Sequence, residues 1–259
     1  MESPADALAR LYDLDLAEDP GDVGLYLALA ARTGGPIVEL ASGSGRVAVP
    51  LAAAGYDVVG VDIDPAMVRR ARRRADAAGA AIARRLELVE GDLRAPRATD
   101  RGRFRLAFMA LNSLLLFPDR GAQAEVLGIL AGLVARGGLV VVDAWQPQPI
   151  DLVRMDGRLS LEWLREDPET GREVTKTASA WYDPSNRTVA LTTLFEEGRP
   201  GEATARWTRQ DRLRLAAADE LIAWAEAAGL EVETLAGDHE LNPYGPGSER
   251  AILVAHRPT

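Results

Sequence analysis

Short runs of apolar residues alternate with longer segments of helical period between residues 36 and 146. A short apolar run without polar alternation is typical of a strand that is buried on both faces of a sheet. We therefore predict strands over residues 37–40, 57–61, 86–89, 104–110 and 139–142, and helices over 46–54, 65–78 and 122–133. Strands that alternate with helices in this way predict a parallel sheet built from βαβ units.

The segments on either side of this stretch have different patterns. Residues 5–32 have helical spacing, which is interrupted at Asp19–Pro20–Gly21–Asp22. Residues 158–215 alternate polar and apolar positions between turn signals at 169–171, 183–186 and 198–201, which predicts an antiparallel meander. A helix over 218–228 and strands over 230–235 and 251–255 follow the meander.

These patterns predict one α/β domain that contains a β insertion. We expect an N-terminal helical segment over residues 1–35, a core over 36–148, the insertion over 149–215 and a return to the core sheet over 216–259. The insertion could act as a lid over a substrate, or its unpaired strand edges could form a homodimer.

Composition narrows the possible functions. The formal net charge is −9, which disfavours a protein that grips the phosphates of nucleic acid. The chain has no cysteine, so disulfides, thiolate metal sites and cysteine nucleophiles are excluded. No apolar run reaches the roughly 20 residues of a membrane span, and the first residues do not resemble a signal peptide. We expect a cytoplasmic protein whose partners are neither nucleic acid nor membrane.

A glycine-rich turn after the first predicted strand carries the main functional signal. Gly43 and Gly45 allow the backbone to approach a ligand closely, and the start of the next helix offers free N–H groups to an anion. Asp62 ends the second strand, where a carboxylate can accept both hydroxyls of a ribose. This pattern alone also fits the dinucleotide site of a nicotinamide-dependent oxidoreductase.

Two further carboxylates favour a different ligand. Glu39 lies inside the first strand, where it would meet a cationic group better than a pyrophosphate, and Asp92 follows the third strand, where it could hold an adenine amino group. With these residues the sequence resembles the class I S-adenosylmethionine-dependent methyltransferases, in the small-molecule branch with a β insertion after the fifth strand. The matching stretches are VELASGSGR at 38–46, GVDIDPAM at 60–67, EGDLR at 90–94, LNSL at 111–114 and GGLVVVD at 137–143.

The resemblance implies a Rossmann-like, seven-stranded, mostly parallel sheet whose last strand is antiparallel. It also implies S-adenosylmethionine as the cofactor. The expected cofactor residues are Tyr12, then Glu39, Ala41, Gly43 and Gly45 around the methionine part, Asp62 at the ribose, Ile63, Met67, Asp92 and Leu93 around the adenine, and Asn112 near the sulfonium.

The sequence lacks two motifs that other branches of this family contain. Residues 112–115 read Asn-Ser-Leu-Leu, where methyltransferases that act on amino groups of bases or glutamine have Asp/Asn-Pro-Pro-Tyr. The strand-four aspartate of metal-dependent catechol methyltransferases is also absent, since residues 108–112 contain no acid. We therefore expect a small-molecule acceptor and no catalytic metal, which leaves Asp143 without a metal partner.

The predicted reaction transfers a methyl group to an N or O atom of a small molecule by direct in-line displacement. The candidate catalytic residues are His239 and Trp145, which lie at the carboxyl edge of the predicted sheet, where open α/β sheets bind ligands. The candidate acceptor-binding residues are Trp145, Trp181, Tyr182, Arg206 and Tyr244. The alternatives are an NAD(P)-dependent oxidoreductase and a non-catalytic partner subunit that keeps only the cofactor pocket.

Overall fold

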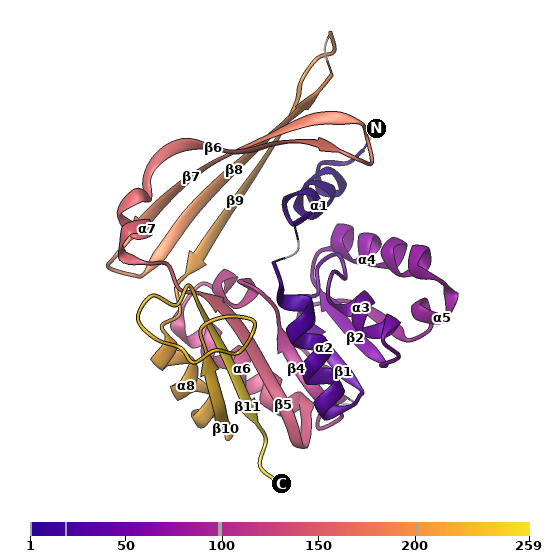
Figure 1. The fold of residues 1–259 in the computed structure, drawn as a ribbon, viewed down its shortest axis with the longest axis vertical. Helices are drawn as coiled ribbons and strands as arrows, with labels where there is room; N and C mark the ends of the chain where they lie inside the picture. The colour runs from indigo at the N-terminus through magenta and orange to yellow at the C-terminus, as the bar shows by residue number, and fades with distance from the viewer. Residues whose placement is uncertain (1, 19, 98–99, 200) are drawn as a thin grey trace. The chain divides into compact units, whose positions relative to one another are not determined.

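The computed structural model describes residues 2–18, 20–97, 100–199 and 201–259, which form two compact units (Figure 1). The core unit joins residues 19–146 to 216–259, and the insertion unit joins residues 1–18 to 147–215. The predicted N-terminal segment, residues 1–35, is therefore shared between the two units. No helix in the described ranges is long and apolar enough to cross a membrane.

The core unit contains a seven-stranded sheet with the order β10-β11-β5-β4-β1-β2-β3. Neighbouring strands among β1 to β5 pair in parallel, and β11 is antiparallel to both β5 and β10. The predicted fold class is confirmed. The strands are β1 Ile37–Leu40, β2 Val58–Asp62, β3 Leu86–Glu90, β4 Phe104–Met109, β5 Val134–Trp145, β10 Glu231–Ala236 and β11 Arg250–His256. The helices are α2 Asp22–Thr33, α3 Ala48–Ala53, α4 Pro65–Ala78, α5 Ala80–Ala83, the 3-10 helix η2 Ser113–Leu116, α6 Arg120–Leu133 and α8 Ala218–Ala227.

Alternate residues of the central strands are buried on opposite faces of this sheet. Ile37 of β1, Phe108 of β4 and Val141 of β5 belong to one buried cluster with Tyr26 of α2, whose ring stacks on Phe108 with 4.1 Å between the centroids. Val140, next to Val141, is fully buried on the other face. Burial on both faces explains why these strands are continuous apolar runs in the sequence.

Strand β5 is longer than the apolar run predicts. It begins at Val134 and contains Gly137 and Gly138, which precede the predicted run over 139–142. The pairing of β4 with β5 shifts register between Phe104 and Leu106, opposite these glycines. A Cβ at Gly138 would lie 3.0 Å from the carbonyl oxygen of Phe104, so the backbones approach each other there too closely for a side chain.

The insertion unit is built on an antiparallel sheet with the order β6-β7-β8-β9, which confirms the predicted meander (Figure 1). Its strands are β6 Asp156–Asp167, β7 Arg172–Asp183, β8 Thr188–Gly198 and β9 Ala205–Arg214, and its helices are α1 Pro4–Asp15 and α7 Pro149–Arg154. Helix α1 packs on one face of the sheet through Leu11 and Leu14, which form a buried cluster with Val174 and Phe195. Trp163 packs against the same cluster, as expected for a core aromatic residue of this sheet.

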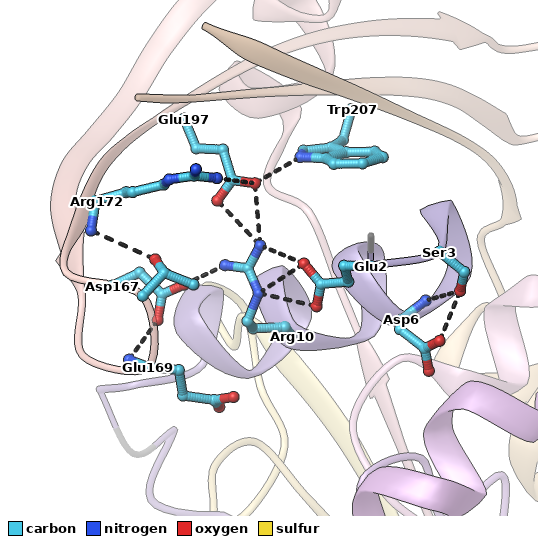
Figure 2. Close-up of polar contacts among 10 residues, drawn as sticks. Glu2, Ser3, Asp6, Arg10, Asp167, Glu169, Arg172, Glu197 and Trp207 are labelled. Carbon is cyan, nitrogen blue, oxygen red and sulfur yellow. Dashed lines mark hydrogen bonds and ion pairs between the residues drawn. The ribbon is translucent and has the colours of Figure 1, made fainter. Parts of the chain in front are cut away.

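A buried ion network joins α1 to the ends of two strands (Figure 2). Arg10 of α1 is only 3% exposed, and its guanidinium forms ion pairs with Asp167 at the end of β6 and with Glu197 near the end of β8. Glu2 also pairs with Arg10, at 3.0 Å, and the indole N–H of Trp207 donates to Glu197 at 2.9 Å. The first residues of the chain therefore belong physically to a sheet formed more than 150 residues later.

Replacing Arg10 should destabilise the protein strongly. Arg10→Ala removes the buried cation shared by the Asp167 and Glu197 carboxylates, and leaves Glu197 only the more distant Arg172, at 4.0 Å. Removing one partner of a buried pair costs about 3–5 kcal/mol. Urea denaturation would measure this loss as a lower free energy of unfolding. The matched control is Arg158→Ala, because the pair of Arg158 with Asp156 is exposed and an exposed pair contributes about 1 kcal/mol or less. Equal losses in the two variants would contradict a stabilising role for the network.

Candidate functional site

The turn after β1 requires backbone conformations that favour glycine. Ala41, Gly43 and Gly45 all have positive φ angles, of 55°, 54° and 74°. A Cβ at Gly45 would lie 3.1 Å from the Cβ of Ala71, whereas one at Gly43 would meet no protein atom within 4 Å. Gly45 is therefore required for packing against α4, while Gly43 faces open space that a ligand can approach.

Gly60 of β2 is a further requirement of this turn that sequence reasoning missed. A Cβ at this position would lie 2.9 Å from the Oγ of Ser42 and 3.1 Å from the side chain of Leu88. The turn can therefore rest on β2 only because β2 has no side chain there. The signal was present in the sequence, since an isolated glycine inside a strand often marks a close backbone approach.

Asp62, at the end of β2, ties the glycine turn to the adjacent strand end. Its Oδ2 accepts a hydrogen bond from the Gly43 N–H at 2.7 Å, and its Oδ1 accepts one from the Asp64 N–H at 2.9 Å. Burial raises the pKa of Asp62, and these backbone hydrogen bonds oppose that shift. Each carboxylate oxygen retains a second lone pair, so Asp62 can still accept two hydroxyl donors.

An open cavity of about 300 Å³ adjoins Asp62 at the carboxyl edge of the sheet. Five of the predicted cofactor residues line it, namely Ala41, Asp62, Ile63, Asp92 and Leu93, whereas Met67 lies outside its lining. Ile63 is 69% exposed, which makes it an apolar surface available to a ring. Arg94, which sequence reasoning did not single out, holds the Asp92 carboxylate through its Nη2 at 2.7 Å and lowers the pKa of that carboxyl.

Glu39 is a buried carboxylate with an unused oxygen. Its side chain lies on the α2-facing side of β1, two residues after Ile37, and it is 3% exposed. Its Oε2 has no hydrogen-bond partner within the described ranges, and burial raises its pKa well above the ordinary value. Arg46, which lowers this pKa through its charge, forms a bidentate pair with Asp22 of α2, with both N–O distances at 2.6 Å.

Asp143 organises the neighbouring strand ends. It is fully buried near the end of β5, where its Oδ1 accepts from Arg250 Nε at 2.6 Å and its Oδ2 lies 2.9 Å from His239 Nε2. Arg250 also donates to Asn112 Oδ1 at 3.2 Å, and the same oxygen accepts from the Trp145 N–H at 2.9 Å. The sequence leaves Asp143 without a metal partner; the structure gives it two protein partners, His239 and Arg250.

The predicted site residues are therefore divided between several places. Asn112, Trp145 and His239 meet around Asp143 and Arg250 in the core unit, where Tyr244 lies in the loop before β11 and is 36% exposed. Tyr12 belongs to the insertion unit, with the Arg209 guanidinium 5.8 Å from the centre of its ring.

Trp181 and Tyr182 are consecutive in β7 and therefore point to opposite faces of the insertion sheet. The expectation that both residues bind one acceptor is inconsistent with this alternation. Arg206 shares the face of Trp181, because the strand register places both on the side opposite Trp207.

The hydrogen bond to Asp143 raises the pKa of His239, and this effect exceeds the opposing effect of burial. The folded state therefore binds the His239 proton more tightly than the unfolded state does. The resulting stabilisation is complete below the unfolded pKa of about 6.5 and is lost as the pH rises through the higher folded value.

His239→Gln should accordingly destabilise the protein most at about pH 5.5, with a deficit that shrinks as the pH rises. Thermal unfolding across a pH series would measure this difference. His256→Gln is the control, because the pair of His256 with Glu231 is largely exposed. A deficit for His239→Gln that stays constant with pH would show that the proton on His239 does not contribute.

Comparison with known proteins identifies a matching domain family and structures of similar fold. Residues 37–138 match the family model described as Methyltransferase domain. An uncharacterized RNA methyltransferase of Parasynechococcus marenigrum is 43% identical over 63 residues, which are 24% of this chain and 13% of that protein. The matches to curated relatives span between 13% and 39% of the length of those proteins.

Solved structures resemble the chain over nearly its whole length. The CcbJ methyltransferase from Streptomyces caelestis is 24% identical with a TM-score of 0.75, covering 94% of this chain and 92% of that one. The sugar N-methyltransferase KedS8 from Streptoalloteichus sp. is 20% identical with a TM-score of 0.74, covering 96% of this chain and 93% of that one. The likeness thus extends beyond residues 37–138, and the resemblance to class I S-adenosylmethionine-dependent methyltransferases is confirmed at the level of the fold.

Proposed function

Because residues 37–138 match a methyltransferase-domain family model and the chain has the class I fold, we propose that this protein transfers a methyl group from S-adenosylmethionine to an amino group of a small molecule. The position of Asp62 carries the proposal. It ends β2 beside the glycine turn, it lines the cavity, and both of its oxygens can still accept hydroxyl donors. A cofactor with a ribose and an adenine fits this arrangement.

The residues around the glycine turn fit the other end of such a cofactor. The free Oε2 of Glu39 is a buried acceptor that needs a donor, and the amino group of a methionine moiety is a cationic donor. Gly43 leaves open space in front of the turn, where the methionine part would lie. Ile63 and Leu93 would contact the adenine, and Asp92, held by Arg94, would accept from its amino group.

The bound sulfonium supplies a methyl group that is already activated for displacement. What the chain must add is alignment of the acceptor and exclusion of water, and such positioning can contribute about 7–11 kcal/mol. Trp145 and Asn112 would contribute to this at the ends of β5 and β4, where the Trp145 backbone N–H fixes the Asn112 side chain. His239 is the candidate to accept a proton, since Asp143 orients its ring and its Nδ1 has no hydrogen-bond partner within the described ranges.

Similarity to KedS8 supports an amino group, and a sugar amine in particular, as the acceptor. The oxidoreductase alternative has less support, because doubly wound dinucleotide-binding sheets have the strand order 3-2-1-4-5-6 and this sheet inserts the antiparallel β11 between β5 and β10. A partner subunit without activity remains the second candidate, and turnover distinguishes it from an enzyme. Closure of the insertion over the acceptor stays a prediction.

Asp62→Ala should weaken the binding of S-adenosylhomocysteine. Loss of charge-assisted hydrogen bonds to the ribose costs about 1.5–3 kcal/mol, or roughly 10- to 150-fold in the dissociation constant. Isothermal titration would measure this change, with Asp57→Ala as the control, because the Asp57 side chain is exposed and pairs with Arg85 away from the cavity lining. Unchanged affinity in a folded Asp62→Ala variant would place the ribose elsewhere, and saturable NADH binding by the wild type without a response to S-adenosylhomocysteine would favour the oxidoreductase.

The acceptor class can be tested with matched sugars. Incubation with S-adenosylmethionine and nucleotide-linked amino sugars should give mono- or dimethylated amines, detected by mass spectrometry. The corresponding sugars with a hydroxyl in place of the amine should stay unmodified. Methylation of the hydroxyl compounds alone would reverse the assignment to nitrogen, while cofactor binding without turnover across a broad panel would favour the non-catalytic subunit.

A further inference from the structure

Arg250 of β11 contacts the ends of two other strands of the core sheet. Its register partner in β5 is Trp145, and Ile252, two residues further along β11, lies opposite Asp143. Because cross-strand partners and alternate residues share one face of a sheet, the Arg250 side chain emerges beside that of Asp143. Its Nε donates to Asp143 Oδ1 at 2.6 Å and its Nη2 donates to Asn112 Oδ1 at 3.2 Å, so one guanidinium bridges the ends of β5 and β4.

This bridge fixes the orientation of the Asn112 amide. The Asn112 Oδ1 accepts from Arg250 and also from the Trp145 backbone N–H, at 2.9 Å. A flipped amide would turn its NH2 group toward these two donors and lose both hydrogen bonds. The NH2 group is therefore held on the opposite side, where it is accessible and has no hydrogen-bond partner within the described ranges. It can donate to a ligand without any rearrangement.

The same guanidinium acts on His239 through Asp143. The Oδ2 of Asp143 lies 2.9 Å from His239 Nε2, and a carboxylate only accepts hydrogen bonds, so Nε2 of the neutral ring carries the proton. The other ring nitrogen, Nδ1, then has a free lone pair and can accept a proton. Asp143 is fully buried, and Arg250 and His239 occupy one of its oxygens each.

Arg250 and Asp143 have opposite effects on the charge of His239. The hydrogen bond to Asp143 raises the pKa of His239, whereas the positive charge of Arg250 lowers it. The other charged groups near the ring are Asp22 of α2 and Asp238 of the same loop. Without Arg250, the Asp143 carboxylate would favour an imidazolium, whose Nδ1 carries a proton and cannot accept another. Arg250 therefore helps to keep Nδ1 available.

The backbone is strained beside both of these groups. Leu111, which precedes Asn112, has a φ angle of 48°, and Leu241, two residues after His239, has one of 61°. Residues with a side chain rarely adopt such angles, and the strain persists only where the surroundings impose it. The hydrogen bonds of Asn112 and His239 to the Arg250–Asp143 pair are constraints of this kind.

We infer that Arg250 is a positioning residue for the proposed methyl transfer, in which it holds the Asn112 amide and the His239 ring ready for the acceptor. The inference rests on the proposed function. In that reaction the acceptor nitrogen bonds to the methyl carbon, the carbon–sulfur bond breaks with its electron pair left on sulfur, and the nitrogen becomes an ammonium. The ammonium gives one proton to His239 Nδ1, which leaves a neutral product amine and an imidazolium.

The two fixed groups also define the class of acceptor. His239 Nδ1 accepts a proton from the amine, and the Asn112 NH2 group donates to an atom with a lone pair. An amine that also carries an oxygen substituent, such as an amino sugar, offers both partners. Arg250 thus adds specificity to the site through Asn112, in addition to its effect on His239 through Asp143.

Titration of His239 by NMR tests the inference without any turnover. The chain has only two histidines, so His256→Gln identifies the ring signals of His239. In the wild type, the nitrogen shifts of the neutral ring should place the proton on Nε2. Arg250→Gln should raise the pKa of His239, because the opposing positive charge is lost. Arg250→Lys keeps a cation beside Asp143 and should leave the pKa of His239 close to that of the wild type.

Kinetics with an amino sugar separate the two effects of Arg250. In Arg250→Gln, kcat/KM should fall most near neutral pH and recover as the pH rises, since His239 loses its proton at a higher pH. In Arg250→Lys the pH profile should resemble that of the wild type. Both variants lose the bridge to Asn112, so the KM for the amino sugar should rise roughly 2- to 13-fold in each.

Arg257→Gln is the matched control for a purely structural role. Arg257 follows β11 at its other end, where its side chain donates to the Val134 carbonyl at 2.8 Å. This variant can lower the stability of the strand but should leave the titration of His239 unchanged. An unchanged pKa of His239 in Arg250→Gln, or a wild-type ring with its proton on Nδ1, would overturn the inference. If the titrations behave as expected and no amine is methylated, the orientation of His239 by Arg250 stands and the proposed function fails.

Discussion

Two carboxylates, Glu39 and Asp143, are buried near the ends of the central strands β1 and β5. Their need for partners constrains which other residues of the core unit must lie beside them. Glu39 and Asp143 continue the α2-facing sides of β1 and β5, and a buried carboxylate is tolerated only with compensating partners or a raised pKa. Asp143 has Arg250 and His239 as partners, so β11 and the loop after β10 are fixed to the end of β5. Glu39 keeps an oxygen without a partner within the described ranges, and its pKa is raised. Asp143 is thus a carboxylate that supports the fold, whereas Glu39 is one that is available to a ligand.

The same constraint determines which parts of the chain form the insertion unit. Asp167 and Glu197 are each no more than 2% exposed, so the sheet that contains them requires a buried cation. That cation is Arg10, which comes from the first helix and not from the insertion itself. The unit therefore joins two segments that are far apart in the sequence. A contiguous stretch such as residues 147–215 expressed alone would contain both acids without Arg10, and Glu197 would keep only Arg172, at 4.0 Å.

Features that depend on neighbouring residues in the sequence were predictable. Ion pairs between residues that are far apart in the sequence were not. The apolar runs, the glycine turn and the carboxylates at 39, 62 and 92 each depend on neighbouring positions. The structure places Asp62 and Asp92 in the lining of a cavity and Glu39 buried within β1. Arg10 and Arg250 look like ordinary surface arginines in the sequence, since Asp167 and Asp143, which they meet, lie 157 and 107 residues away. The separation of Trp181 from Tyr182 follows from strand alternation, but only once β7 is known to contain both.

The proposed cofactor residues and the candidate acceptor residues lie in different parts of the chain. This difference explains why the cofactor is easier to infer than the acceptor. The family pattern covers residues 37–138, and the residues proposed to hold the cofactor lie within it apart from Tyr12. Of the candidate acceptor residues of the core unit, Trp145 ends β5, while His239 and Tyr244 lie in the loop between β10 and β11, all outside the matched stretch. A shared cofactor imposes the same contacts on every relative, whereas a loop varies more in sequence than the elements it connects. This loop is held partly by backbone hydrogen bonds, such as the one from the Tyr244 N–H to the Leu235 carbonyl at 3.0 Å, which do not depend on the identity of its side chains. Acceptor specificity can therefore diverge in this loop while the turn proposed to bind the cofactor stays the same.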